Sequence, residues 1–317
     1  MPGILVALGG NALHRAGGNG SWDEARIQMR QAVSVLAEVA ASGEILVLSH
    51  GNGPQVGALL RQNELAAREV PPRPMDVLGA ETQGQIGYLI QTELTPALLR
   101  RGVRRSVVTV ISRTEVSASD PAFSHPSKPV GRYYPEDEAR VLRKQYGWSM
   151  VYDGARGGWR RVVPSPKPVR WIEGDAVRSF LESSGGSSWI PIVAGGGGIP
   201  VVRRPDGTYE GVEAVIDKDL AASMVARELG IHTLAVVTDV PGAAISFGKR
   251  GERWLAHVSK RDLSEYYKRG EFGEGSMGPK VAAGIEFLDG GGRRFVIADI
   301  PSLARALRGE AGTRVDA

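Results

Sequence analysis

Cysteine is absent from the 317 residues of this chain. Its absence excludes disulfide bonds, thiol catalysis, iron–sulfur clusters and cysteine-based zinc sites. Histidine is scarce as well, and its positions show none of the close spacing that metal ligands need. The five histidines are His14, His50, His125, His232 and His257. We therefore expect no metal ion that the protein holds by itself.

Long apolar runs are also missing. No uninterrupted run approaches the ~18–20 residues that a membrane-spanning helix requires. The first apolar segment, Ile4–Leu8, is too short for the apolar part of a signal peptide. Together with the lack of cysteine, these absences favour an intracellular protein, and we expect it in the cytoplasm without membrane attachment.

The common nucleotide-binding signatures are not present either. Gly248-Lys249 is followed by Arg250, so it lacks the hydroxyl residue with which a P-loop holds magnesium. The run Gly51–Gly57 is one residue too long for the dinucleotide fingerprint, and no acidic residue closing a following strand lies about twenty positions on. Protein-kinase signatures are missing too. These absences disfavour P-loop kinases and protein kinases, and they leave a Rossmann dehydrogenase poorly supported.

What the chain does have is an ordinary globular composition with one departure. Hydrophobic residues make up 42% and charged residues 23%, which sets aside wholesale disorder and collagen-like structure. The 42 glycines are roughly twice the usual share and cluster after apolar segments. The net charge of +4 fits anionic small molecules as readily as nucleic acid. The length suits one large α/β domain or two lobes.

Apolar runs alternate with helical spacing along most of the chain. Ile4–Leu8 and Ile45–Leu48 each run into a glycine loop, and helical patterns follow at Asp23–Ala41 and from Gln55 to about Arg68. Further apolar runs occur at Val107–Ile111, Trp189–Val193, Leu234–Val237 and Arg294–Ala298, and further helical stretches at Asp217–Leu229 and Pro279–Leu288. Buried parallel strands with crossover helices explain this α/β pattern best.

Two regions break the alternation. Residues from about Gly131 to Arg170 are polar, aromatic and rich in turn signals, which is typical of a protruding subdomain or lid. Val201–Arg204 and Tyr209–Val212 flank the turn sequence Pro205-Asp206-Gly207, which predicts a small hairpin.

Three glycine loops follow strand candidates, namely Gly9-Gly10, Gly51–Gly53 and Gly195–Gly198. Backbone N–H groups at such a junction, together with the positive end of a following helix, stabilise a phosphate without any side chain. A single loop of this kind is usually only a tight turn. Three in one chain favour a phosphate-bearing ligand.

Three lysines stand where they could serve phosphoryl transfer, which depends on positioned cations more than on a strong base. Lys128 lies between two prolines, Lys218 precedes a helix directly after Asp217, and Lys280 follows Pro279 at a helix start. Each also has an ordinary explanation. Lys128 could be a turn lysine, Lys218 a solvated neighbour of an N-cap aspartate, and Lys280 a lysine at a helix start. The pattern alone leaves both readings open.

Taken together, these segments resemble the amino-acid kinase superfamily and, within it, carbamate kinase, over nearly the whole chain. The segments are Val6–Leu13, Ser49–Gly57, Ala80–Tyr88, Asp120–Phe123, Pro126–Gly131, Gly157–Pro166, Gly195–Val201, Gly211–Ala222 and Gly275–Lys280. Related N-acetylglutamate and aspartate kinases carry a lysine shortly before the first glycine pair, where this chain has Val6-Ala7-Leu8. In carbamate kinases the lid base supplies that cation, which is Lys128 here.

The resemblance implies a fold, an activity and roles for individual residues. It implies a three-layer α/β/α, open, mainly parallel sheet with a protruding lid, and reversible phosphoryl transfer between ATP and carbamate. The residues implied to hold carbamoyl phosphate are Gly9, Gly10, Asn11, Gly51, Asn52 and Gly53. Those implied to carry the transfer are Lys128, Lys218, Asp219 and Lys280, with Asp219 organising the lysines. Those implied to bind the nucleotide are Thr238, Asp239, Ala244, Gly275, Met277 and Lys280.

The resemblance also sets expectations about organisation and partners. Residues 1–213, with the lid at about 131–170, would form the acceptor lobe, and residues 214–317 the nucleotide lobe. Magnesium, held largely by nucleotide phosphates and water, would accompany ATP or ADP. A homodimer is implied, and we expect no nucleic-acid partner.

Two positions depart from the family pattern. Ala244 stands where we expect tyrosine, so adenine stacking is weaker or supplied elsewhere. The segment Ile111–Glu115 differs from the Thr-Gln-containing run that the family usually has there. It includes Arg113, and we expect this residue to place a cation near the acceptor pocket. These departures keep open a sibling kinase with another carboxylate or phosphate acceptor. A non-catalytic nucleotide-sensing homologue is the third hypothesis.

Overall fold

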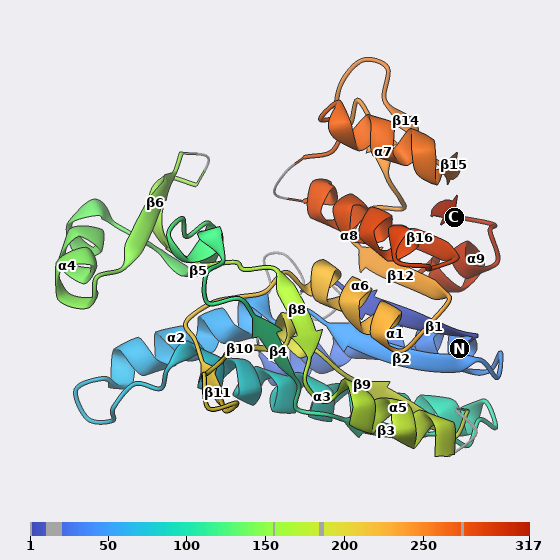
Figure 1. The fold of residues 1–317 in the computed structure, drawn as a ribbon, viewed down its shortest axis with the longest axis horizontal. Helices are drawn as coiled ribbons and strands as arrows, with labels where there is room; N and C mark the ends of the chain where they lie inside the picture. Colours follow the sequence, from blue (N-terminus) through green and yellow to red (C-terminus); the bar gives the residue numbers. More distant parts are fainter. Residues whose placement is uncertain (1, 11–20, 155, 184–186, 274–275) are drawn as a thin grey trace.

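A computed structural model describes residues 2–10, 21–154, 156–183, 187–273 and 276–317. Its main feature is an eight-stranded sheet in the order β15-β17-β16-β12-β1-β2-β9-β3 (Figure 1). Neighbouring strands run parallel except β16 and β17, which are antiparallel. The strands are β1 (Gly3–Leu8), β2 (Ile45–His50), β3 (Ser106–Thr109), β9 (Trp189–Ile192), β12 (Thr233–Thr238), β15 (His257–Ser259), β16 (Arg294–Asp299) and β17 (Thr313–Asp316).

The central strands are apolar throughout because helices cover both faces of the sheet. In β1, Val6 and Leu8 enter one core while Leu5 and Ala7 enter the other, and all four are fully buried. The first core packs on α1 (Trp22–Ala40), α3 (Met75–Arg100) and α9 (Leu303–Leu307). The second packs on α5 (Gly174–Ser183), α6 (Lys218–Glu228), α7 (Lys260–Lys268) and α8 (Met277–Asp289). The predicted three-layer, mainly parallel α/β/α architecture is therefore confirmed.

A second sheet lies beside the main one, in the order β11-β10-β4-β8. Its strands are β4 (Arg113–Val116), β8 (Pro168–Trp171), β10 (Ile199–Arg203) and β11 (Tyr209–Gly211). β10 and β11 form the predicted hairpin, with Arg203 opposite Tyr209. β4 and β8 were not expected from the sequence, because their short runs mix polar and apolar residues.

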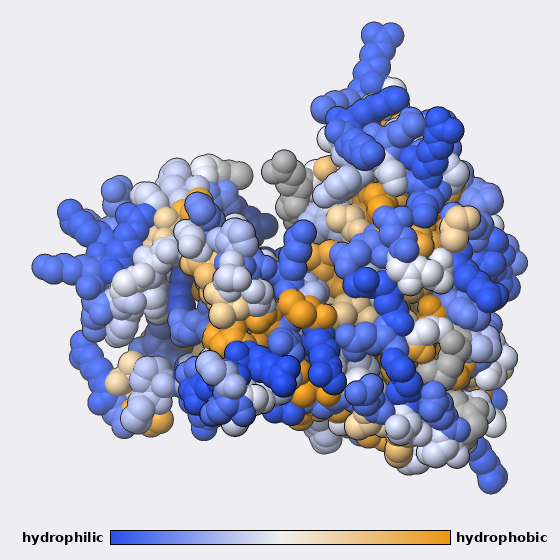
Figure 2. All heavy atoms as spheres, viewed as in Figure 1, coloured by the Kyte–Doolittle hydropathy of each residue, from blue (hydrophilic) through white to orange (hydrophobic). Residues whose placement is uncertain are grey.

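The lid projects from this body (Figure 1). It contains a three-stranded antiparallel sheet and one helix, with its own small core around Tyr134 and Met150. The elements are β5 (Lys128–Tyr134), α4 (Glu136–Tyr146), β6 (Ser149–Asp153) and β7 (Gly158–Val163). The expected range 131–170 covers most of it, although residues 168–171 pair with β4 instead. Figure 2 shows the surface hollowed between the lid and the part that carries α7 and α8.

The remaining elements are α2 (Gly53–Ala66) and the strand pair β13 (Ala244–Ile245) and β14 (Arg253–Trp254), with short 3₁₀ turns at Pro121–Phe123 and Gly195–Gly197. The helices and strands expected from apolar spacing are present and begin or end within about two residues of the predicted positions. Across the described ranges, no helix is both long and apolar enough to cross a membrane.

Candidate active site

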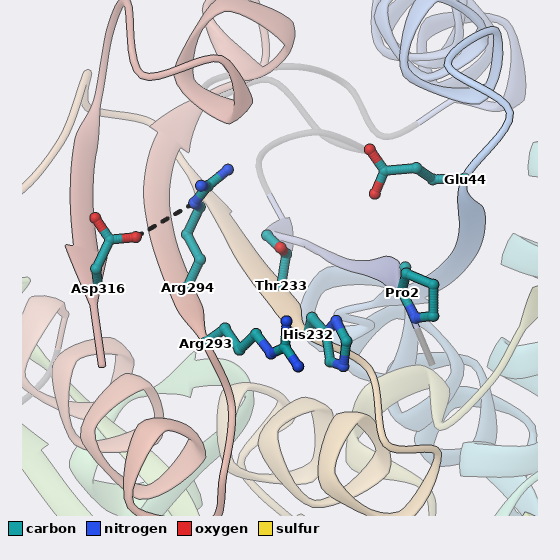
Figure 3. Close-up of a pocket in the computed structure, with 8 residues that line it drawn as sticks. Pro2, Glu44, His232, Thr233, Arg293, Arg294 and Asp316 are labelled. Carbon is teal, nitrogen blue, oxygen red and sulfur yellow. Dashed lines mark hydrogen bonds and ion pairs between the residues drawn. The ribbon is translucent and has the colours of Figure 1, made fainter.

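Two cavities lie at opposite edges of the main sheet. The smaller, about 220 Å³, is at the amino ends of β1, β12 and β16, where Arg294 is bound to Asp316 (Figure 3). It is lined by Pro2, Gly3, Glu44, His232, Thr233, Arg293, Arg294 and Asp316. None of the residues predicted from the sequence to bind substrate or nucleotide or to carry the transfer belongs to it. Ligands of open parallel sheets bind at the carboxyl ends of the strands, so the opposite edge is the candidate site.

At that opposite edge the three glycine loops meet. Gly51 N–H donates to the carbonyl of Leu8 at 3.0 Å, which joins the second loop to the first. Val193 N–H donates to Leu48 at 2.8 Å, which brings the third loop, Gly195–Gly198, beside the second. Because these strands are parallel neighbours, their loops gather at one edge, as the phosphate-binding hypothesis requires. Asn11 lies outside the described residues.

Glycine is required where the loops pack closely against neighbouring segments. A Cβ on Gly9 would lie 2.7 Å from the carbonyl oxygen of Val237. Gly196 has φ +67°, and a Cβ there would lie 2.3 Å from the amide nitrogen of Asn52. The third loop therefore packs directly against Asn52.

Two side chains of α3 hold the loops together, and neither was predicted to have a role. Gln83 donates to the carbonyls of Ser112 (3.1 Å) and Gly195 (3.0 Å), and it accepts from Ser112 N–H at 2.7 Å. Thr82 Oγ1 accepts from the amide of Asn52 at 2.8 Å. Both residues lie in the family-like segment Ala80–Tyr88, which was the only signal that could have identified them.

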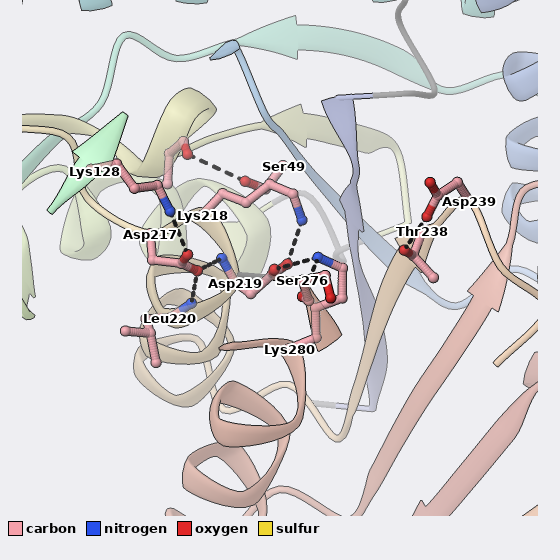
Figure 4. A network of polar contacts seen from close by, with 11 residues as sticks. Ser49, Lys128, Asp217, Lys218, Asp219, Leu220, Thr238, Asp239, Ser276 and Lys280 are labelled. Atoms are coloured by element: carbon pink, nitrogen blue, oxygen red, sulfur yellow. Dashed lines mark hydrogen bonds and ion pairs between the residues drawn. The ribbon is translucent and has the colours of Figure 1, made fainter. Parts of the chain in front are cut away.

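A cluster of lysines and carboxylates lies next to the loops (Figure 4). Asp219, at the start of α6 and only 2% exposed, binds Lys218 and lies 3.4 Å from Lys280 Nζ, which comes from α8. Lys128 Nζ lies 2.9 Å from Asp217 Oδ2. The structure therefore brings all four predicted transfer residues into one network and adds Asp217.

The charges of this cluster do not cancel. Three ammonium groups, from Lys128, Lys218 and Lys280, face the two carboxylates of Asp217 and Asp219. Burial alone would raise the pKa of Asp217, but the charge and hydrogen bond of Lys128 and the N–H of Asp219 outweigh it, so the pKa lies below its usual value. The three lysines therefore outnumber the two carboxylates, and the cluster favours an incoming anion.

The larger cavity, about 740 Å³, opens beside this cluster and is of a size that suits a nucleotide. It runs from Gly9, Gly10, Lys218 and Lys280 to an end with Ala244, Phe247 and Phe272. The predicted nucleotide residues Thr238, Asp239, Ala244, Met277 and Lys280 all line it. Gly275 lies outside the described residues.

The other predicted site residues lie beyond Lys218. Gly51, Asn52, Gly53 and Lys128 do not line the larger cavity as the described residues define it. The side chain of Lys218 passes 3.3 Å from the position that a Cβ on Gly51 would take. Lys218 therefore lies between the second glycine loop and the larger cavity, which the first loop also lines.

Aromatic surface is present near Ala244. Ala244 is buried and pairs with Trp254 across the β13–β14 hairpin. Phe247 lines the cavity and is 59% exposed. Its ring contacts the ring of Trp254 edge-on, with 6.0 Å between the two ring centroids. Ser246, just before Phe247, has φ +52° and donates its N–H to Glu271. A ring therefore faces the cavity three residues beyond the position where tyrosine was expected.

Arg113 is held away from the glycine loops, contrary to expectation. Its Nε lies 2.8 Å from Glu173, and its backbone N–H binds the same carboxylate at 2.7 Å. Ser112 Oγ accepts from the N–H of Ala194, the residue before the third loop, at 2.9 Å, and Thr114 Oγ1 donates to the carbonyl of Gly197 in that loop at 3.0 Å. Because side chains alternate along a strand, Arg113 points to the opposite face of β4.

Protein ligands for a metal ion are few at this site. Within the described ranges, no group of three or more histidine, aspartate or glutamate side chains is placed to hold one. Both oxygens of Asp219 already bind lysines. This donor set fits a magnesium ion that arrives on nucleotide phosphates and keeps several waters.

Comparison with known proteins agrees with this geometry. Residues 3–299 match the model of the amino acid kinase family. The chain is 45% identical to the carbamate kinase of Pyrococcus horikoshii over 98% of both chains, and 44% identical to that of Halobacterium salinarum over 99% of this chain and 98% of the other. It also resembles the solved carbamate kinase of Giardia lamblia bound to AMP-PNP, with 38% identity, a TM-score of 0.92 and coverage of 99% and 98%. The chain therefore belongs to the amino acid kinase family and, within it, to the carbamate kinases.

Proposed function

We propose that this chain transfers the phosphoryl group of carbamoyl phosphate to ADP, forming ATP and carbamate, and that it also catalyses the reverse reaction. The observation that carries the proposal is the position of Asp219, which holds Lys218 and Lys280 together between the glycine loops and the larger cavity. A cluster of cations between two anion-binding surfaces suits transfer of a charged group from one to the other.

Carbamoyl phosphate would bind on the glycine-loop side. Backbone N–H groups of the first two loops, other than that of Gly51, which is donated to Leu8, would hold it, with Asn52 fixed by Thr82. The residues assigned to this role are Gly9, Gly10, Asn11, Gly51, Asn52 and Gly53. Lys128 and Lys218 would contact the phosphoryl group from the lid base and from the start of α6.

The nucleotide would occupy the larger cavity, with its phosphates toward Lys280. The Giardia enzyme was solved with AMP-PNP, an ATP analogue, which supports a nucleotide site in this fold. Thr238, Asp239, Ala244 and Met277, with Gly275, would surround the nucleoside part.

No general base is needed in this proposal. The carbamate oxygen is already an anionic nucleophile, so Asp219 would orient the lysines rather than remove a proton. Its burial and its two lysine contacts suit that role. As the transferred group loosens from one oxygen, the lysines would stabilise the charge spread over its three other oxygens. Magnesium, when bound with the nucleotide, would neutralise part of the phosphate charge.

The remaining expectations about organisation stay part of the proposal. Residues 1–213 would form the acceptor lobe with the lid, and residues 214–317 the nucleotide lobe. The relationship to carbamate kinases also implies a cytoplasmic homodimer that acts on small molecules and not on nucleic acid.

The alternative of another acceptor rested on Arg113 and Ala244, and Ala244 lines the larger cavity and not the glycine-loop side. Because Glu173 binds this arginine on the opposite face of β4, the residue does not add a cation to the glycine-loop side. The non-catalytic alternative is disfavoured, because all four transfer residues are present and in contact with one another or with Asp217.

A panel of acceptors tests the function. Purified protein with magnesium and ATP is offered carbamate, aspartate or N-acetylglutamate, and ADP release is followed by a coupled assay. We expect turnover with carbamate at least about 100-fold above that with the amino acids, since a site built for one acceptor leaves polar groups unpaired with another. Faster turnover with either amino acid would refute the assignment of the acceptor.

A further inference from the structure

The two carboxylate oxygens of Asp217 make separate contacts. Oδ1 accepts from the backbone N–H groups of Asp219 (2.9 Å) and Leu220 (3.4 Å), which caps the first turn of α6. Oδ2 accepts from Lys128 Nζ at 2.9 Å (Figure 4). One side chain therefore connects the helix that carries Lys218 and Asp219 to the lysine of the lid base.

Capping alone does not require a negative charge. Asparagine and serine cap helices about as well as aspartate does. The charge of Asp217 matters most at the second oxygen, where it forms the ion pair with Lys128, and the nearby charge of Lys218 adds a smaller contribution. That pair is more than a surface contact, because the side chain of Asp217 is only 15% exposed.

Lys128 lies at the junction of the lid and the body. It is the first residue of β5, and it pairs with Val163, the last residue of β7. A lysine has a long, flexible side chain, so without a partner its ammonium group would sample many positions. The contact with Asp217 limits that freedom and directs Lys128 toward the start of α6.

We propose that Asp217 is a positioning residue that holds Lys128 in place for phosphoryl transfer before carbamoyl phosphate binds. The inference rests on the proposed function, in which Lys128 contacts the phosphoryl group. Asp217 acts through Lys128 and not on the substrate. It keeps the ammonium group of Lys128 close to the start of α6, where Lys218 lies, before the substrate arrives. Such preorganisation reduces the entropy lost in reaching the reactive geometry.

Four variants test this role in the assay of ATP formation from ADP and carbamoyl phosphate. Asp217→Asn keeps the cap and removes the charge, Lys128→Met removes the partner, and the double variant removes both. The matched control is Glu213→Gln, which breaks the 2.7 Å ion pair between Glu213 and Arg161 of β7, another contact between the lid base and the segment before α6. Calorimetry measures ADP binding, and thermal unfolding checks the fold.

We expect Asp217→Asn to lower kcat by about 10- to 100-fold, with ADP affinity within about twofold of the wild type. The double variant should be as slow as Lys128→Met alone, because Asp217 acts only through that lysine. Glu213→Gln should keep kcat within about twofold. Any of three results would overturn the inference. The first is a wild-type kcat in Asp217→Asn, and the second is a kcat in the double variant that falls by the product of the two single-variant losses. The third is a loss of kcat in Glu213→Gln as large as that in Asp217→Asn.

A second measurement does not depend on turnover. Lysine labelling by an amine-reactive reagent, read by mass spectrometry, should modify Lys128 about threefold faster or more in Asp217→Asn than in the wild type, since a side chain held in an ion pair meets the reagent less often than one that moves freely. Unchanged labelling would overturn the positioning role. A wild-type protein that forms no ATP from carbamoyl phosphate, with this labelling difference intact, would instead refute the proposed function.

Discussion

Lys280 extends from α8 to place its Nζ 3.4 Å from Oδ2 of Asp219, which is buried at the start of α6. The two residues are 61 positions apart in the chain. The same carboxylate also binds Lys218. Asp219 therefore fixes the distance between the two helix starts that border the larger cavity, and this relationship underlies the proposed chemistry.

Replacing Asp219 with asparagine should slow transfer without abolishing nucleotide binding. The amide removes the charge that holds Lys218 and Lys280 together, so the ammonium groups would repel each other and move apart. We expect kcat to fall by about 100-fold or more and ADP affinity to stay within about threefold, from steady-state kinetics and calorimetry. Asp289→Asn, which breaks an exposed 3.0 Å pair with Lys260, is the control and should have little effect. Full activity in Asp219→Asn would leave that residue only a structural role.

Phe247 should contribute to binding of the nucleobase. Its exposed ring lines the cavity beside Ala244, and a ring contact of this kind is worth ~0.5–1.5 kcal/mol. Phe247→Ala should weaken ADP binding by about 3- to 10-fold while kcat at saturating ADP stays near the wild-type value. Phe247→Tyr keeps the ring and should bind ADP normally. Equal ADP affinity in all three proteins would show that the base does not contact this ring.

Gly196 should not tolerate alanine. Its φ of +67° is unfavourable for alanine, and the new Cβ would clash with Asn52. We expect Gly196→Ala to lower the free energy of unfolding by about 1–3 kcal/mol in urea denaturation. Gly84→Ala is the matched control, because Gly84 is exposed on α3 with nothing within 4 Å of a Cβ, and it should be neutral or slightly stabilising. Similar effects of both substitutions would contradict the close packing of the loops.

His50 should make the fold less stable in mild acid. Burial lowers the pKa of this histidine from 6.5 to about 4, even though the Gly51 carbonyl opposes the change. Between these values the unfolded chain binds a proton that the folded protein does not, so stability is present above pH 6.5 and is lost as the pH falls toward 4. The expected loss is about 3 kcal/mol. Urea denaturation at several pH values should show a smaller loss in His50→Gln, and identical pH profiles would contradict the assignment.

The sequence predicted six of the eight strands of the main sheet, because the central strands are buried on both faces, whereas β15 and β17 at one edge were not expected. The central strands are short, continuous apolar runs, as in Ile4–Leu8, and the glycine runs that end them mark the edge where the loops gather. The mixed strands β4 and β8 lack this pattern, since pairing with neighbours far along the chain, and not local spacing, defines them.

Contacts within the site were harder to predict. Asp217 was recognised as a candidate N-cap, which the structure confirms, but its pairing with Lys128 links residues 89 positions apart and leaves no trace in local spacing. Arg113 was expected near the acceptor, and this was wrong, because the alternation of β4 directs it to Glu173, 60 positions away. The roles of Gln83 and Thr82 likewise depend on loops that only the folded chain brings together.

The most direct test of the account compares the wild-type protein with Lys128→Ala in one assay. Both proteins receive ADP, magnesium and carbamoyl phosphate, and ATP formation is followed by a coupled reaction after circular dichroism has shown that both are folded. The account predicts ATP formation by the wild type and a loss of about 1,000-fold or more in Lys128→Ala, because a positioned cation stabilises the transferred group. No ATP formation by the folded wild type, or equal rates in the two proteins, would contradict it.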